Sequence, residues 1–571
     1  MFTCLKGKTI RFLIGFHFYI AFAIKMWYAV KKEGGVSVKK HTVKLLALIL
    51  AVCMLLSGCA AIKEYFSVMG SLLMGGNAYD FAEMTYVRPD LEQLQAILDD
   101  SCAKAETETQ IDALVESIYA FYDAYDSFYT AQALAMIHYS KDMTNAYWEA
   151  EYNFCTENLS QVAAGLDRLY RALAKSPLRE TLETAEYFGA DYFDSYEGQS
   201  IFDETFTAMM DREAQLQNDY FAAYAAAGEQ AEGADALISL CGEELAQILA
   251  ELVILRCRMA QHAGYDSYPE FAYDFYHARD YSPAQATAYL ADIRAELVPL
   301  YRQIAEDRPQ ITLYTCDEAA TFDYVKQLAT SLGGTFYQAF GMMTGSDLYD
   351  ISPGANKMNA SFETYISNYQ APYVFINPTE TEHDKLTFAH EFGHFCNDYA
   401  SGGSPVGVDV AEFFSQGLEY LSLEYGPAST NLTKLKMLDC LCVYVEQAAY
   451  ASFEQQLYEL PEEEVTPETI TQLYTQVCGG FGLDGGMYYV LVTHFYTSPM
   501  YVISYVVSND AALQLYQLEQ ATPGAGKRCL EENLDTMQPY FLAFLEEAGL
   551  QSPFAPGRLA EVKQTLQGIL Q

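Results

Sequence analysis

The sequence is poor in basic residues and has no obviously paired cysteines. It contains 33 Lys and Arg against 76 Asp and Glu, which gives a formal net charge of −43 at pH 7. Such a surface repels nucleic acid phosphates and anionic lipid headgroups, so we expect no nucleic acid partner. The 13 cysteines form no C-x-x-C pair and no repeated spacing, which argues against a zinc ribbon or a disulfide framework.

Proline and glycine-rich tracts are also scarce, and several common catalytic motifs are missing. With 18 prolines and no long Gly/Ser tract, the chain does not have the composition of a fibrous or disordered protein. No P-loop, dinucleotide fingerprint or G-x-S-x-G elbow occurs in its 571 residues. Hydrophobic residues make up 51% of the chain, which is enough for a large core and two or more packed lobes.

Helical periodicity dominates the chain after about residue 79. The clearest helical segments are residues 90–105, 109–131, 159–174, 243–263 and 282–307. Residues 358–362 and 372–377 instead favour short strands. We therefore expect a mainly α-helical protein with a mainly helical N-terminal lobe (residues 80–340) and a C-terminal lobe (residues 341–571) that contains a small β-sheet.

The N-terminus has the pattern of a secretory signal followed by a lipid-attachment site. A lysine-containing stretch (residues 39–44) precedes twelve apolar residues (45–56) and then Ser57-Gly58-Cys59. The ending resembles a bacterial lipobox, in which the cysteine is lipidated and becomes the mature N-terminus. The sequence thus predicts an exported lipoprotein anchored to the outer face of a membrane through Cys59. An uncleaved membrane anchor is the alternative, although a spanning helix needs about 20 apolar residues.

Residues 1–59 are therefore assigned to the signal region and residues 60–79 to a short tether. A second apolar patch lies upstream of the signal, which is unusual for such a segment. One explanation is that translation starts at Val36 or Val38 and that residues 1–35 are not part of the protein. Cleavage at Cys59 removes nine basic residues and one acidic residue, so the exported part is still more acidic.

The strongest functional signal is the segment His390-Glu391-Phe392-Gly393-His394. Residues four apart lie on one face of a helix, so the two imidazoles can hold one metal ion from the same side. The glutamate between them then lies beside the water that completes the metal's shell. Chance produces the pattern in about one chain in a hundred of this composition. The pattern is typical of zinc metallopeptidases, with His390 and His394 as ligands and Glu391 as general base.

A third ligand is expected because a catalytic zinc commonly takes three protein ligands and keeps one position open. Glu412 follows eighteen residues after His394, and the stretch 402–405 supplies a turn between them. Apolar neighbours on the same helix favour a buried carboxylate for Glu412, although a solvated surface position is the alternative. Asp409 is well placed to cap the N-terminus of that helix.

Several segments besides the H-E-x-x-H motif resemble the zinc metallopeptidase family of oligoendopeptidase F and thimet oligopeptidase. They are residues 264–271, 372–377, 384–390, the helix with Glu412, Ser415 and Glu419, and residues 494–505. The resemblance covers roughly residues 250–510. It implies a helical two-lobed fold with a deep channel that admits short peptides and excludes folded proteins. It also implies one Zn²⁺ per chain, bound by His390, His394 and Glu412, and we assign Asp409 and Glu419 as supporting residues.

The segment 494–505 is expected to face the substrate. Attack on a peptide carbonyl creates an oxyanion that needs hydrogen-bond donors beyond the metal. The resemblance assigns this role to His494, Tyr501 and Tyr505, and the spacing of the two tyrosines would place them on one helical face. In a chain with 46 tyrosines, an ordinary role as core aromatics is the alternative for Tyr501 and Tyr505.

The predicted function is zinc-dependent endopeptidase action on short peptides by a monomer. The stretch Asn359-Ala360-Ser361 is predicted to align the peptide backbone by strand addition. The remaining histidines after the tether have no partner at ligand spacing and are predicted to be structural or surface residues; they are His138, His262, His277 and His383. Two alternatives stay open: a non-catalytic peptide-binding lipoprotein, for which Glu391 would have no use, and a zinc carboxypeptidase of related helical fold.

Overall fold

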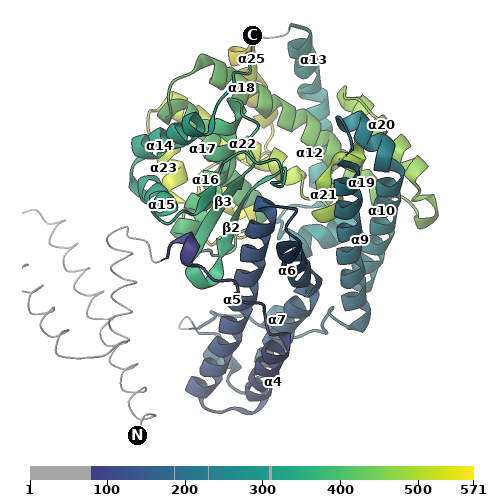
Figure 1. The fold of residues 1–571 in the computed structure, drawn as a ribbon, viewed down its shortest axis with the longest axis vertical. Helices are drawn as coiled ribbons and strands as arrows, with labels where there is room; N and C mark the ends of the chain where they lie inside the picture. Colours follow the sequence, from purple (N-terminus) through teal and green to yellow (C-terminus); the bar gives the residue numbers. More distant parts are fainter. Residues whose placement is uncertain (1–78, 185–186, 229, 308–310) are drawn as a thin grey trace, which may run out of the picture. The chain divides into compact units, whose positions relative to one another are not determined.

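The computed structural model describes residues 79–184, 187–228, 230–307 and 311–571 (Figure 1). The predicted signal region, its lipidation site Cys59 and the tether up to residue 78 lie outside the described residues, so export and lipidation stay predictions. Within the described ranges, none of the helices combines the length and the apolar composition needed to cross a membrane.

Helices make up most of the described chain, which confirms the predicted mainly α-helical class. The first half contains α4 (Leu91–Thr107), α5 (Ile111–Lys141), α6 (Ala146–Glu157), α7 (Leu159–Ala174), α8 (Arg179–Leu182), α9 (Glu204–Gly228), α10 (Ala234–His262), α11 (Tyr268–Phe271), α12 (Pro283–Glu296), α13 (Val298–Asp307), α14 (Glu318–Leu332) and α15 (Gly334–Gly345). The second half contains α16 (His383–Ser401), α17 (Val408–Tyr425), α18 (Thr430–Cys442), α19 (Ala448–Leu457), α20 (Pro467–Phe481), α21 (Thr493–Thr497), α22 (Ile503–Ala521), α23 (Ala525–Glu532), α24 (Phe541–Glu547) and α25 (Arg558–Leu570).

The predicted helical segments are helical in the structure, but some of their bounds differ. The segment 159–174 coincides with α7, whereas α5 continues ten residues beyond the predicted end. The segment 282–307 is divided into α12 and α13 at Leu297. Pro299 explains the break, because proline has no N–H to donate to the preceding turn. Ser282 caps α12 with a reciprocal capping box.

A three-stranded sheet precedes the H-E-x-x-H helix, as the sequence predicted. Its strands are β1 (Tyr349–Asp350), β2 (Ser361–Ile366) and β3 (Ala371–Ile376), in the order β1-β3-β2. β3 is buried along its whole length and pairs antiparallel with β2, with Ser361 opposite Ile376 and Ile366 opposite Ala371. The predicted strand at 358–362 was placed three residues too early. Met358 instead bonds through its N–H to the Ser140 carbonyl, which keeps the residues before 361 out of the ladder.

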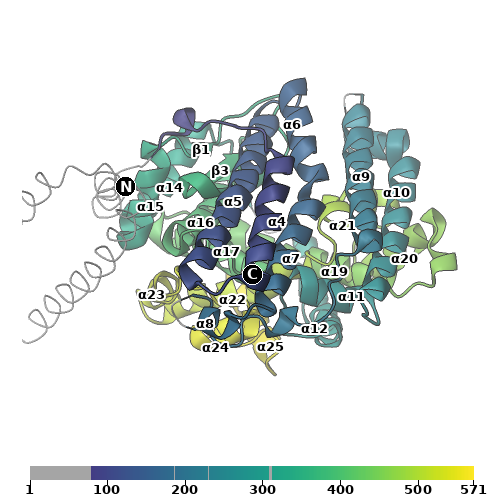
Figure 2. The same cartoon turned by 90° about the horizontal axis from the view of Figure 1, so that it is seen from below.

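The buried apolar side chains of the described residues form two clusters. The smaller cluster includes residues of α4, α5 and α7, and the larger one takes side chains from both predicted lobes. The division into lobes at residue 340 therefore stays a prediction, as does a deep channel between them. Within the larger cluster, α17 packs against both α16 and α22, and Figure 2 shows it between them. This three-helix arrangement positions the candidate site.

Candidate active site

The helix that carries the H-E-x-x-H motif has well-defined ends. Asp384 in its first turn accepts hydrogen bonds from the backbone N–H groups of Thr379 and Thr381, at 2.9 and 3.1 Å. The helix ends at Gly402, which adopts a left-handed conformation with φ +69°, as expected for a C-terminal cap. The predicted turn after the motif is therefore confirmed. His390 and His394 lie on one face, with ring centroids 5.1 Å apart.

Gly393 allows the helix of the third candidate ligand to come close. A Cβ atom at this position would lie 2.6 Å from the Phe414 carbonyl oxygen and 2.6 Å from the Ser415 Cα. Both are backbone atoms of α17, which cannot move aside without moving the whole helix. The glycine inside the motif is therefore a packing requirement, and it lets α17 deliver Glu412 to the two histidines.

The structure brings His390, His394 and Glu412 together. One possible ligand atom from each residue lies within 4.8 Å of the others, and His390 Nε2 is 3.4 Å from Glu412 Oε2. Zinc takes nitrogen and carboxylate donors at about 2.1 Å in a tetrahedral shell, which places neighbouring donors about 3.4 Å apart. Two imidazoles and a carboxylate at these separations fit a catalytic zinc ion.

Glu412 is a buried, hydrogen-bonded carboxylate with 3% of its surface exposed. Its Oε1 accepts a hydrogen bond from the Tyr501 hydroxyl at 2.7 Å, and its Oε2 accepts one from the Ser415 hydroxyl at 3.2 Å. A solvated surface position for this residue is therefore excluded. These donors fix the orientation of the carboxylate next to His390.

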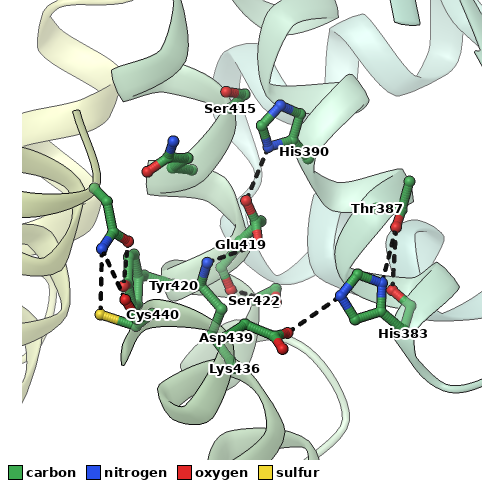
Figure 3. A network of polar contacts seen from close by, with 12 residues as sticks. His383, Thr387, His390, Ser415, Glu419, Tyr420, Ser422, Lys436, Asp439 and Cys440 are labelled. Carbon is green, nitrogen blue, oxygen red and sulfur yellow. Dashed lines mark hydrogen bonds and ion pairs between the residues drawn. The ribbon is translucent and has the colours of Figure 1, made fainter. Parts of the chain in front are cut away.

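Glu419 is hydrogen-bonded to His390, as Figure 3 shows. Its carboxylate accepts a hydrogen bond from His390 Nδ1 at 2.8 Å. It also forms an ion pair with Lys436 Nζ at 2.7 Å. Burial alone would raise the pKa of Glu419, but Lys436 and His390 outweigh it and lower the pKa to about 2. Since a carboxylate only accepts, the Nδ1 proton faces Glu419, which leaves Nε2 on the side of Glu412.

Asp409 does not cap its helix as predicted, because α17 begins at Val408 and Gly407 is the N-cap residue. The Asp409 side chain lies inside the first turn and is buried against Arg279, with nitrogen–oxygen distances of 3.3 and 3.5 Å. The Tyr281 hydroxyl donates a further hydrogen bond to it at 2.8 Å. Asp409 therefore neutralises a buried guanidinium, and its side-chain hydrogen bonds within the described residues go to Arg279 and Tyr281 and not to the three candidate ligands.

Arg279 connects Asp409 to the turn that carries Tyr501. Its guanidinium donates to the Met500 carbonyl at 2.8 Å and to the Ser504 hydroxyl at 2.7 Å. On the other side of the turn, the Met500 N–H donates to Glu454 at 2.7 Å. Arg279 and Glu454 were missed in the sequence because each lies far along the chain from its partner and belongs to no short motif. The same holds for Lys436.

His494, Tyr501 and Tyr505 form one cluster beside Glu412. Their ring centroids are 5.4 to 5.6 Å apart, and His494 Nε2 lies 3.1 Å from the Tyr505 hydroxyl. The prediction that the two tyrosines share one helical face is wrong, because α22 begins only at Ile503. Met500 has a left-handed backbone conformation with φ +63°, which breaks the helix before Tyr501. The turn nevertheless places the Tyr501 ring next to Tyr505.

Glu391 lies on α16 between the two histidines, with 6% of its surface exposed. Burial raises its pKa to about 7; His390 opposes this shift, whereas Glu412 adds to it. A residue that the sequence did not suggest, Glu363 on β2, has one buried carboxyl oxygen without a hydrogen-bond partner within the described part of the chain. Burial raises its pKa, and the nearby carboxylates of Asp398 and Glu391 raise it further. The strand pattern of the sequence did not indicate that Glu363 would lie near Glu391.

The three residues predicted to align a peptide lie at the start of β2. Asn359 is exposed in a bend, Ala360 follows it, and Ser361 is the first residue of the strand. β2 is an edge strand, since β3 is its one strand partner in the described sheet. An edge strand can accept an added strand. Peptide binding by Asn359, Ala360 and Ser361 stays a prediction.

Comparison with known proteins identifies related domains. Residues 81–200 match the Peptidase M3 N-terminal domain, and residues 335–536 match Peptidase family M3. Among curated proteins, none matches the sequence.

Solved structures share the fold. A provisionally assigned oligoendopeptidase F superposes with a TM-score of 0.77 at 22% identity, over 86% of this chain and 99% of that chain. PZ peptidase A, solved with an inhibitor, gives 0.77 at 19% identity, over 86% and 99%. A provisionally assigned oligoendopeptidase F from Bacillus anthracis gives 0.75 at 21% identity, over 86% and 98%. At these identities the likeness shows the fold alone.

Proposed function

The chain belongs to peptidase family M3, and on that premise we propose that it is a zinc-dependent endopeptidase that hydrolyses short peptides. The observation that carries the proposal is the convergence of His390, His394 and Glu412 within 4.8 Å, with Glu391 buried beside them. A peptide-binding protein without catalysis would need neither a three-ligand metal site nor a base next to it.

His390, His394 and Glu412 would hold the zinc ion. When bound, Zn²⁺ supplies Lewis-acid activation of a water molecule and of the scissile carbonyl. Glu391 takes the proton of that water and delivers it to the leaving amine. Glu419 keeps His390 oriented through the hydrogen bond to Nδ1, and Lys436 keeps Glu419 ionised.

The aromatic cluster is proposed to stabilise the negative charge that develops on the substrate carbonyl. His494, Tyr501 and Tyr505 offer an imidazole and two hydroxyl groups within one enclosure. The Tyr501 hydroxyl donates to Glu412 in this structure and can turn to a substrate oxygen. Hydrogen-bond donors in a buried site lower the barrier because they stabilise the developing negative charge more strongly there than in water.

The decisive variant is Glu391→Gln. We expect turnover of quenched fluorescent peptides to fall by about 10²- to 10⁴-fold, the usual contribution of a general base. Bound zinc, measured by elemental analysis, should stay at one ion per chain. Glu243→Gln, an exposed carboxylate on α10, is the matched control and should keep wild-type turnover. Retained turnover in Glu391→Gln, or wild-type cleavage that chelation does not abolish, would contradict the proposal.

Two further points of the proposal need separate tests. Internal cleavage of a C-terminally amidated peptide, mapped by mass spectrometry, is expected of an endopeptidase; no cleavage of it would favour carboxypeptidase action. We also propose export and lipid anchoring through Cys59. The wild-type protein should fractionate with membranes in a bacterial host and take up labelled fatty acid, whereas Cys59→Ala should do neither.

A further inference from the structure

A cavity of about 390 Å³ lies beside Tyr501, and its charged lining residues are all acidic among the described residues. Its walls come from α6, α7, α9 and the segment around Tyr501, so they join residues that are far apart in the sequence. Glu157, Asp211 and Glu213 line it, whereas none of the described residues that line it is Lys or Arg. A volume of several hundred Å³ is typical of pockets that bind small ligands or side chains.

His277 forms part of the same wall and supplies a buried acceptor. It is 7% exposed, and its Nε2 lies 2.9 Å from the Pro499 carbonyl oxygen. Because a carbonyl oxygen can only accept, Nε2 carries the proton and Nδ1 has a free lone pair. Within the described part of the chain Nδ1 has no hydrogen-bond partner. Buried polar atoms nearly always have a partner, and because His277 lines the cavity, a donor placed there can supply one.

The acidic charge of the cavity is only partly neutralised. Glu213 forms an ion pair with Arg256 at 2.6 Å, and the positive charge of Arg256 neutralises the negative charge of Glu213. Asp211 accepts a hydrogen bond from the uncharged Ser160 hydroxyl at 2.6 Å, and Glu157 is exposed with no ion pair recorded among the described residues. Two carboxylates therefore remain at the exposed rim, and the His277 acceptor lies at the buried wall.

A second, larger cavity adjoins the first and has a different charge. It has a volume of about 690 Å³ and shares Glu157, Ser160 and Asp211 with the first. Its other lining residues include Arg168, Arg171 and Lys175, so its charge is mixed. Of these two cavities, the one next to Tyr501 is therefore the one lined by acidic side chains without Lys or Arg among the described residues.

We infer that the cavity beside Tyr501 binds a cationic group of the peptide substrate, with Glu157 and Asp211 attracting it and His277 Nδ1 accepting one of its N–H groups. A lysine or arginine side chain and the terminal ammonium group share this chemistry. The inference rests on the proposed peptidase function, since it assigns a specificity pocket to that active site. It predicts that a positive charge at one position of the peptide increases cleavage.

Matched peptides test the inference. One set of quenched fluorescent peptides replaces each position in turn by lysine or by norleucine, and a parallel set is N-acetylated. We expect kcat/KM to be higher with lysine than with norleucine at one position, or higher for the free than for the acetylated N-terminus. The first result identifies a side chain as the ligand and the second identifies the terminal ammonium. Equal kcat/KM across both sets would overturn the inference.

The double variant Glu157→Gln/Asp211→Asn connects any preference to the cavity. Exposed charge pairs contribute about 0.2–1 kcal/mol each, so the ratio of kcat/KM for charged over neutral peptide should fall on the order of twofold to thirtyfold. The double variant Glu243→Gln/Asp292→Asn removes two exposed carboxylates, on α10 and α12, so it is the charge-matched control and should leave the ratio unchanged. An unchanged ratio in the double variant would refute the assignment.

A binding measurement separates this inference from the proposed function. Fluorescence anisotropy with Glu391→Gln reports the affinity for labelled lysine and norleucine peptides without turnover. If no peptide is cleaved by the wild-type protein, the proposed function fails, and the affinity ratio still decides the pocket. Tighter binding of the charged peptide that disappears in the Glu157→Gln/Asp211→Asn background supports the inference; equal affinities contradict it.

Discussion

The variant Asp409→Asn probes how the fold holds the turn that carries Tyr501. The substitution keeps the size of the side chain but removes the negative charge that neutralises Arg279. Both side chains are buried, with 2% exposure for Asp409 and none for Arg279, so water cannot replace the lost partner. Arg279 in turn donates to the Met500 carbonyl and the Ser504 hydroxyl. An uncompensated guanidinium at this point should therefore loosen the turn.

The size of the effect follows from the burial. Removing one partner of a buried ion pair costs about 3–5 kcal/mol. The asparagine oxygen can still accept one hydrogen bond, so we expect a loss of about 3 kcal/mol. Unfolding entropies near 2.1 cal/mol/K per residue give about 1 kcal/mol/K for the compact unit of about 500 residues. The melting temperature should therefore fall by about 3 °C.

Differential scanning calorimetry and urea titration measure this loss. Asp292→Asn, which makes the same chemical change on the surface of α12, should shift stability by less than about 0.5 kcal/mol. Arg279→Gln breaks the same pair from the other side, so the double variant should lose clearly less than the sum of the two single losses. Additive losses, or an Asp409→Asn loss no greater than that of the surface control, would show that the pair does not stabilise the turn.

Three further variants test other parts of the site. Glu419→Gln should weaken zinc binding by about 10- to 100-fold in chelator competition because His390 loses its supporting carboxylate, whereas the exposed Glu424→Gln on the same helix should not. Gly393→Ala should also weaken zinc binding while keeping the helical circular dichroism, because its Cβ forces α16 and α17 apart; unchanged affinity would contradict the packing argument. Burial raises the pKa of Glu454 to about 8, against the pull of Arg256 and Arg279. A carboxyl protonated more readily in the folded state stabilises the fold below its unfolded pKa, near 4.3, and this contribution is lost as the pH rises through 8. Glu454→Gln should therefore flatten the decline of the melting temperature between pH 5 and 8, and an unchanged slope would refute the assignment.

The local features of the site could be read from the sequence. A four-residue spacing places His390 and His394 on one face of any helix, whatever surrounds it. The left-handed preference of glycine marks the end of that helix at Gly402. Helical periodicity likewise predicted the fold class, because apolar faces at this spacing form wherever a helix packs on a core.

Contacts between distant segments were decided only by the tertiary structure. Arg279 meets Asp409 across 130 residues, and neither residue has a neighbour in sequence that reveals the other. The approach of α17 to Gly393 depends on how two helices cross, and the left-handed Met500 depends on its two hydrogen bonds, from Arg279 and to Glu454. The cavity at His277 is likewise built from α6, α7, α9 and the Tyr501 turn together. The sequence by itself determined which residues can bind a metal, since that is a matter of residue type and short spacing. Which groups orient those residues was determined by packing.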